Sequence, residues 1–227
     1  MPTYRWCHGA FCVLVLGLIS AATAQSPAYQ PVGLAKAGQI PYPPNTITPG
    51  LVTLDVSVDA TAAILKIVSI RDVPPLTDAA RTALNSWKFT QAVKSGQRVP
   101  GVARVNVVFN PFNPGDVSIP NKPLPPPETG ASLAGIFQPP HVKTANYATY
   151  PVNTVASGTV VLDVKVDADG SLQGARVLGG EGGGPLTGMA TRAVHNWSFA
   201  PATYEGQPIA AHTIVAYVFP SPAQGTP

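Results

Sequence analysis

The sequence has few charged residues and almost no cysteine. Charged side chains make up 11% of its 227 residues, far below the roughly 25% of an ordinary soluble domain, which argues against a coiled coil or a charged disordered tail. The formal net charge is only +3, and aromatic residues are not interleaved with any basic run, so we expect no nucleic-acid partner. Hydrophobic residues make up 45% of the chain, which is enough for a packed core.

The longest apolar run lies at the N-terminus and predicts a signal peptide over residues 1–24. Arg5 supplies a positive charge, residues 10–19 are almost wholly apolar, and Ala22-Thr23-Ala24 has the small-x-small pattern that signal peptidase cuts after. An apolar core of roughly ten residues is about half the length of a membrane span. We therefore expect cleavage before Gln25 and no stable membrane span afterwards, with an uncleaved anchor as the alternative.

Both cysteines, Cys7 and Cys12, lie in the segment that we expect to be removed. The mature chain would then have neither a disulfide nor a reactive thiol. An exported chain without cysteine depends on its packed core for stability.

The rest of the sequence contains one pattern twice. LDVSVDA, which begins at Leu54, returns as LDVKVDA at Leu162, and LTDAARTALNSWKF at Leu76 returns as LTGMATRAVHNWSF at Leu186. Further pairs in the same order are Tyr42-Pro43 with Tyr150-Pro151, Asn45-Thr46 with Asn153-Thr154, Gly50 with Gly158, Gly96 with Gly206, and Phe109 with Phe219. Such an ordered series predicts two homologous units. We place them at residues 41–112 and 141–222, joined by a Pro-rich linker at 113–140.

Each copy predicts two strands, a helix and a last strand. Apolar residues alternate with polar ones from Val52 to Asp59, as in a half-buried strand. Asp169-Gly170 predicts a hairpin turn into a returning strand in the second copy. Apolar or small residues then recur at helical spacing from Leu76 to Trp87, and the last strand is expected over 102–109. The predicted fold class is α+β, with two β-β-α-β units, each a helix packed on a small antiparallel sheet.

The second copy carries an ordered set of short motifs. They are Tyr150-Pro151, Gly158, Asp167-x-Asp169-Gly170, Trp197-x-Phe199-x-Pro201-Ala202, Gly206-x-Pro208 and a closing Phe219. In this order they resemble the C-terminal domain of TonB energy transducers. The first copy departs from the pattern at Thr61-Ala62, where Asp-Gly is expected, and at Gln91 and Arg98, where Pro is expected. The chain is thus similar to a tandem of TonB C-terminal-like domains.

The resemblance implies a periplasmic, non-catalytic domain that binds extended peptide segments of outer-membrane or other envelope proteins by strand addition to a sheet edge. We expect a periplasmic or secreted protein with this function. In an energy transducer a long Pro-rich spacer follows a membrane helix, whereas here the Pro-rich segment stands between the copies. A membrane-anchored, TonB-like energy transducer is the alternative.

The last strand of each unit is the candidate partner-binding edge, because the first two strands pair through their hairpin. The expected outward residues are Arg104 and Asn106 in the first copy, and Ile214, Ala216 and Val218 in the second. Arg104 would discourage uncontrolled pairing. The apolar second edge is expected either to pair with the other copy or to accept a peptide strand.

No motif predicts a catalytic, cofactor or metal site. The loop Asp167-Ala168-Asp169-Gly170 lacks acids at Lys165 and Arg176, where a calcium loop has them. The glycine run at 179–184 lacks the Lys-Ser/Thr pair of a phosphate loop. The histidines at 141, 195 and 212 have no ligand spacing.

An enzyme is the further alternative. It would use the outward acids Asp55, Asp59, Asp163 and Asp167, and paired carboxylates need a pocket that shifts their pKa values apart. A cleft over these acids would favour an enzyme, and a flat surface would argue against it.

Overall fold

The computed structural model describes residues 29–44, 46, 48–111, 118–119, 136–151, 155–180 and 184–221. The predicted signal peptide and most of the predicted linker lie outside these residues. Within the described part, no helix is both long and apolar enough to cross a membrane. We refer to the described residues up to 111 as the first half and those from 136 as the second half.

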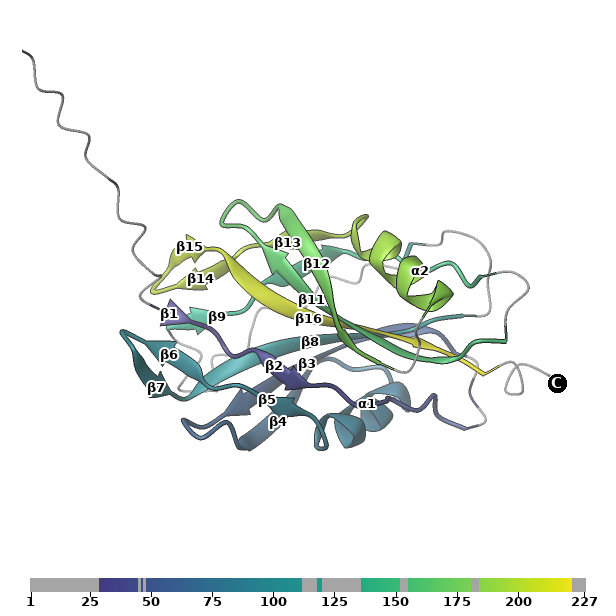
Figure 1. Cartoon of the computed structure of the whole chain (residues 1–227), viewed down its shortest axis with the longest axis horizontal. Coiled ribbons are helices and arrows are strands. Elements are labelled where there is room, and N and C mark those ends of the chain that lie inside the picture. Colours follow the sequence, from purple (N-terminus) through teal and green to yellow (C-terminus); the bar gives the residue numbers. More distant parts are fainter. Residues whose placement is uncertain are drawn as a thin grey trace, which may run out of the picture.

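A single six-stranded sheet runs through both halves (Figure 1). Its strands, in spatial order, are β12 (Leu172–Gly179), β11 (Gly158–Val166), β16 (Ala211–Phe219), β8 (Gly101–Phe109), β3 (Gly50–Val58) and β4 (Ile64–Arg71). The two last strands, β8 and β16, pair in parallel at the centre, and every other neighbouring pair is antiparallel. The expectation of two separate small sheets is therefore wrong, because the last strands of the two halves pair with each other and join the strands of both halves into one sheet.

The predicted strands and their alternation are present, but both sides of β3 are covered. Val52 and Leu54 are fully buried, as expected for the apolar side. Thr53, on the side that we expected to face water, is also fully buried. The reason is that the shared sheet has a core on each of its faces, so the half-buried pattern of one copy becomes a buried strand in the whole molecule.

The helices α1 (Leu76–Leu84) and α2 (Pro185–Val194) lie on opposite faces of the sheet (Figure 1). Because the equivalent strands β8 and β16 pair in parallel, the two halves are related by a half-turn about an axis along these strands. This rotation puts the helix of one half on the opposite face of the sheet from the helix of the other. Each face then buries the helix of one half together with apolar side chains from the other. Ile214, Ala216 and Val218 belong to the core under α1, whereas Leu51 and Val108 belong to the core under α2.

Short strands that the sequence analysis missed complete each half. They are β1 (Tyr29–Gln30), β2 (Leu34–Lys36), β5 (Lys88–Phe89), β6 (Ala92–Lys94) and β7 (Gln97–Val99) in the first half, and β9 (Phe137–Gln138), β10 (His141–Thr144), β13 (Ser198–Ala200), β14 (Ala202–Tyr204) and β15 (Gln207–Ile209) in the second. Small sheets form in the same way in both halves: β1-β6-β7 matches β9-β14-β15, and β2-β5 matches β10-β13. Strands β1 and β2 precede residue 41, where the first unit was expected to begin, and β9 lies within residues 113–140, the expected linker.

The segments that carry β2 and β10 cross from one half to the other. The backbone N–H of Ile40 donates to Thr159 Oγ1 of β11 at 2.9 Å. In the second half, the backbone N–H of Ala148 donates to Asn110 Oδ1, just after β8, at 2.9 Å. These buried hydrogen bonds join the halves on both faces of the sheet, and both would be lost if the halves separated.

Candidate functional site

The five expected partner-binding residues lie inside the sheet, where β8 meets β16. Strand β16 has β11 on one side and β8 on the other, and β8 lies between β16 and β3. The residues are Arg104, Asn106, Ile214, Ala216 and Val218, and none is more than 5% exposed. Of the two outcomes expected for the apolar edge, pairing with the other copy is the one that the structure has. Addition of a peptide strand at these residues would require the halves to separate.

The two polar residues among them have partners within the protein. Asn106 accepts a hydrogen bond from Thr53 Oγ1 at 3.0 Å and donates to Thr213 Oγ1 at 3.1 Å. Arg104 donates two hydrogen bonds of 2.7 Å to the carboxylate of Asp55 on the adjacent strand. These side chains do not prevent pairing, because their polar groups are hydrogen-bonded to other residues in the centre of the sheet.

The outermost strands of the shared sheet are β4 and β12. Leu65 on β4 is 59% exposed and Val177 on β12 is 46% exposed. An outermost strand can pair its backbone with an added strand, and exposed apolar side chains favour such an addition. The strands expected to form the partner-binding edges, β8 and β16, are therefore internal, and the outermost strands of the sheet are the hairpin strands β4 and β12.

A cleft of about 840 Å³ lies where β8 and β16 diverge. These strands pair with each other only over residues 105–109 and 214–218, and ahead of these residues they separate toward the short hairpins (Figure 1). The segment from Tyr29 to Leu34 forms one wall, β11 and β12 contribute Asp163, Lys165 and Arg176, and Tyr204 and Ile209 come from the β14–β15 hairpin.

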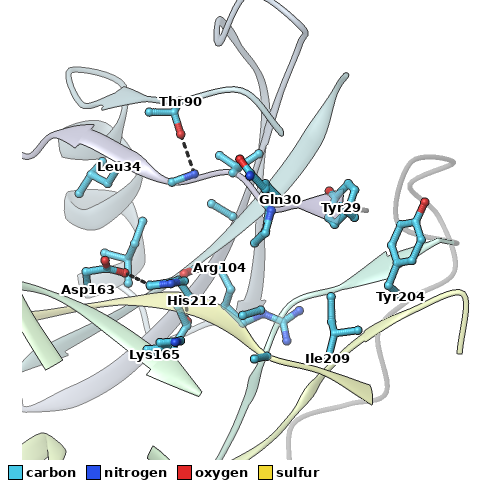
Figure 2. A pocket seen from close by; sticks show the side chains of 18 of the residues that line it. Tyr29, Gln30, Leu34, Thr90, Arg104, Asp163, Lys165, Tyr204, Ile209 and His212 are labelled. Carbon is cyan, nitrogen blue, oxygen red and sulfur yellow. Dashed lines mark hydrogen bonds and ion pairs between the residues drawn. The ribbon is translucent and has the colours of Figure 1, made fainter. Parts of the chain in front are cut away.

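One end of the cleft is charged (Figure 2). His212 Nδ1 lies 2.8 Å from Asp163 Oδ1, and Arg176 donates to Asp163 Oδ2 at 3.2 Å. Burial alone would raise the pKa of the Asp163 carboxyl, but the hydrogen bonds and charges of His212 and Arg176 outweigh burial and hold the pKa below its usual value. Asp163 is therefore ionised near neutral pH. Lys165, next to it on the same side of β11, is exposed.

The other end is aromatic. The rings of Tyr29 and Tyr204 stack with their centroids 4.8 Å apart, and Phe137 packs against Tyr29 at 4.9 Å. Burial, followed by the neighbouring Tyr204, raises the pKa of Tyr29 to about 12, so its hydroxyl stays protonated at physiological pH. This end can contact an apolar or aromatic group.

The four acids considered for catalysis are not brought together. Because Asp55 and Asp163 alternate with buried residues that pack under different helices, they project from opposite faces of the sheet. Asp59 accepts hydrogen bonds from Thr61 and Ala63 in a turn, which lower its pKa, and Asp167 caps the equivalent hairpin. Asp163 alone of the four lines the cleft, and a carboxyl with a lowered pKa is a poor general acid at neutral pH.

The histidines have separate surroundings. His141 is half-buried near Arg104, and burial followed by that positive charge lowers its pKa, while the His195 ring contacts the carbonyl of Thr191 at 2.6 Å. Among the described residues, no group of three or more His, Cys, Asp or Glu could hold a metal ion. The Asp167–Gly170 loop is a hairpin turn in which Ser171 bonds back to Asp169 and Asp167. Part of the glycine run, residues 181–183, lies outside the described residues.

Repeated signals in the sequence could have revealed the parts that were missed. Tyr29-Gln30-Pro31 and Phe137-Gln138-Pro139 open the two halves and carry β1 and β9. Ser95-Gly96 and Glu205-Gly206 have positive φ at both positions, as a two-residue hairpin turn requires. Their spacing matches that of the longer repeat, so they would have extended each copy to include the walls of the cleft.

Residues 146–220 match the family model described as the Gram-negative bacterial TonB protein C-terminal. The match includes β11, β12, α2 and β13–β16 of the second half. No curated protein and no solved structure was found to match the chain.

Proposed function

We propose that the protein is a non-catalytic binding protein of the cell envelope that engages extended peptide segments of outer-membrane or other envelope proteins by strand addition. The observation that carries this proposal is the TonB C-terminal domain at residues 146–220. Such domains are periplasmic, generally non-catalytic, and bind segments of outer-membrane receptors. The same order of strands and helix in the first half supports a tandem of two related domains.

Strand β12 is the edge that we assign to the partner. It belongs to the matched domain and is the outermost strand on that side of the sheet. An added strand would pair with its free backbone groups and contact the half-exposed Val177. The equivalent edge in the first half is β4, where Leu65 is exposed at a different position along the strand, close to the hairpin turn.

The two alternatives differ from this proposal in what they require. A membrane-anchored energy transducer would retain residues 1–24 as its anchor. An enzyme would need two carboxylates in one pocket, whereas Asp55 and Asp163 project from opposite faces of the sheet. The cleft beside Asp163 therefore gives no support to paired-carboxylate catalysis.

Replacement of Val177 by Lys tests the assignment of the edge. Peptides that cover the periplasmic segments of outer-membrane transporters from the native host would be screened against the full mature chain, and the affinity of the best peptide measured by calorimetry. Because an added charge at an edge opposes strand pairing, we expect Val177→Lys to weaken binding by about tenfold or more.

Leu65→Lys on β4 is the matched control, since Leu65 is also an exposed apolar residue on an edge strand. It should leave peptide affinity unchanged. Binding that survives Val177→Lys but is lost in Leu65→Lys would move the site to the first half, and failure of every transporter segment to bind would contradict the proposed function.

A further inference from the structure

The cleft between the diverging ends of β8 and β16 is separate from the edge strand proposed to bind peptides. Its volume of about 840 Å³ falls in the range of roughly 300–1,000 Å³ that is usual for small-molecule sites. The lining residues come from distant parts of the sequence, among them the segments near positions 30, 104, 165 and 210. A ligand held there would contact both halves of the molecule.

Equivalent positions in the two halves differ in the size of the side chain next to the aspartate, and this difference leaves room for the cleft beside Asp163. Asp163 of β11 corresponds to Asp55 of β3, and Ile214 of β16 corresponds to Arg104 of β8. In the first half the long Arg104 side chain lies against Asp55 and binds it with two hydrogen bonds. In the second half the shorter, apolar Ile214 stands at that place, and the partners of Asp163 are His212 and Arg176.

Positive charge exceeds negative charge at the polar end of the cleft. Arg104 is neutralised by Asp55, and Asp163 is engaged by Arg176 and His212. Lys165 is paired across strands with His212 and lies beside this group. Its ammonium group forms no ion pair or hydrogen bond with another described residue. One uncompensated cation therefore stands at the cleft, which suits a ligand with one negative charge.

The remaining lining can contact an apolar body. The side chains are those of Tyr29, Val32, Leu34, Tyr204, Ile209 and Ile214. Figure 2 shows Asp163, His212 and Lys165 together at one end, with Tyr29 and Tyr204 at the other. A charged end and an aromatic end in one cleft match a molecule that is itself charged at one end and apolar at the other.

We propose that this cleft binds a small organic acid, with its carboxylate at Lys165 and Arg176 and its apolar or aromatic body against Tyr29 and Tyr204. The carboxylate accepts charge-assisted hydrogen bonds from the two cations. The apolar body displaces water from the tyrosine rings and from Ile209. The ligand class follows from this pairing of one free cation with an apolar wall.

Titration calorimetry of the full mature chain tests the proposal with three probes. Hydrocinnamate has a carboxylate on an aromatic body, hydrocinnamamide has the same body without the charge, and acetate has the charge without the body. We expect hydrocinnamate to bind and both other probes to bind at least about tenfold more weakly. No binding of hydrocinnamate at millimolar concentration, or equal binding of the amide, would overturn the proposal.

Lys165→Gln removes the free cation at an exposed position where folding is not at risk. We expect it to weaken hydrocinnamate binding by about tenfold, because one charge-assisted contact is lost. Lys66→Gln is the matched control, since Lys66 is an exposed lysine on β4, outside the cleft, and it should not change the affinity. Equal losses in the two variants would show a general charge effect and exclude this site.

The test is independent of peptide binding. Val177→Lys should leave hydrocinnamate affinity unchanged, because Val177 does not line the cleft. Lys165→Gln should leave peptide affinity unchanged, because Lys165 lies on β11 and not on the edge strand β12. Loss of acid binding in Val177→Lys would place the acid at the sheet edge and overturn the assignment to the cleft.

Discussion

Arg104 and Asn106 show that the burial of a polar side chain depends on what packs over its side of the strand. Both alternate with buried valines on β8, and in one isolated copy they would face water. The second half covers this side of β8, so Asn106 lies between Thr53 and Thr213 and Arg104 binds Asp55. The alternation in the sequence puts both residues on the same side of β8. Alternation is a property of each strand alone, so it does not tell whether water or the second half covers that side.

Replacement of Arg104 by Met tests the buried ion pair. The carboxylate of Asp55 would keep its place without a partner, and breaking a buried pair costs about 3 kcal/mol or more. The same change should raise the pKa of His141, since burial and the positive charge of Arg104 both lower it at present and Asp55 favours the charged ring. Urea unfolding would measure the first effect and NMR titration of His141 the second.

Arg81→Met is the control for this experiment. Arg81 pairs with Asp78 at 3.4 Å, and their side chains are 41% and 77% exposed, so the pair contributes about 1 kcal/mol at most. Equal destabilisation by the two variants, or an unchanged His141 pKa in Arg104→Met, would contradict the role given to the Arg104–Asp55 pair.

At the level of elements, length decides what the sequence could predict. Strands of eight or nine residues and the two helices have enough positions to show a period, and all of them were found. Strands β1, β5 and β9 have two residues each, which show no period at all. They form because backbone groups of a neighbouring segment pair with them, so only the repeat could have revealed them.

Two glycine substitutions should have opposite effects. Gly206 has φ +78 in the β14–β15 turn and Gly188 is an exposed residue of α2, and a methyl group at either position would meet no atom within 4 Å. Gly206→Ala should destabilise the fold by about 1 kcal/mol, because alanine resists positive φ. Gly188→Ala should stabilise it by roughly 1 kcal/mol through helix propensity.

Thermal or urea unfolding of both variants would measure the difference. Gly96, with φ +80 and equally open surroundings in the β6–β7 turn, offers a replicate within the same molecule. If Gly206→Ala and Gly96→Ala were neutral, the turns would not have the backbone conformation on which this argument depends.

On the scale of the whole molecule, the two halves share one sheet and both cores. The core under α1 includes Val161 and Ile214 from the second half, and the core under α2 includes Leu51 and Val108 from the first. The cleft belongs to this scale as well, because its walls meet only when β8 and β16 pair at one end and diverge at the other. The sequence offered pairing of the last strands as one of two outcomes. No motif within one copy shows where the paired strands separate, so the cleft could not be predicted.

The shared core predicts that the protein unfolds in a single transition. The mature chain expected from the sequence has one tryptophan in each half, Trp87 and Trp197, and both are buried. Trp197→Phe leaves a fluorescent probe in the first half, and Trp87→Phe leaves one in the second. Because separation of the halves would expose Ile214, Ala216 and Val218 and leave Asn106 without Thr213, neither half should unfold alone.

Each variant's fluorescence transition should coincide with its own far-ultraviolet circular dichroism transition, whatever the overall loss of stability. A fluorescence midpoint clearly apart from the dichroism midpoint in either variant would show that the halves fold independently and that the sheet between β8 and β16 contributes little to stability.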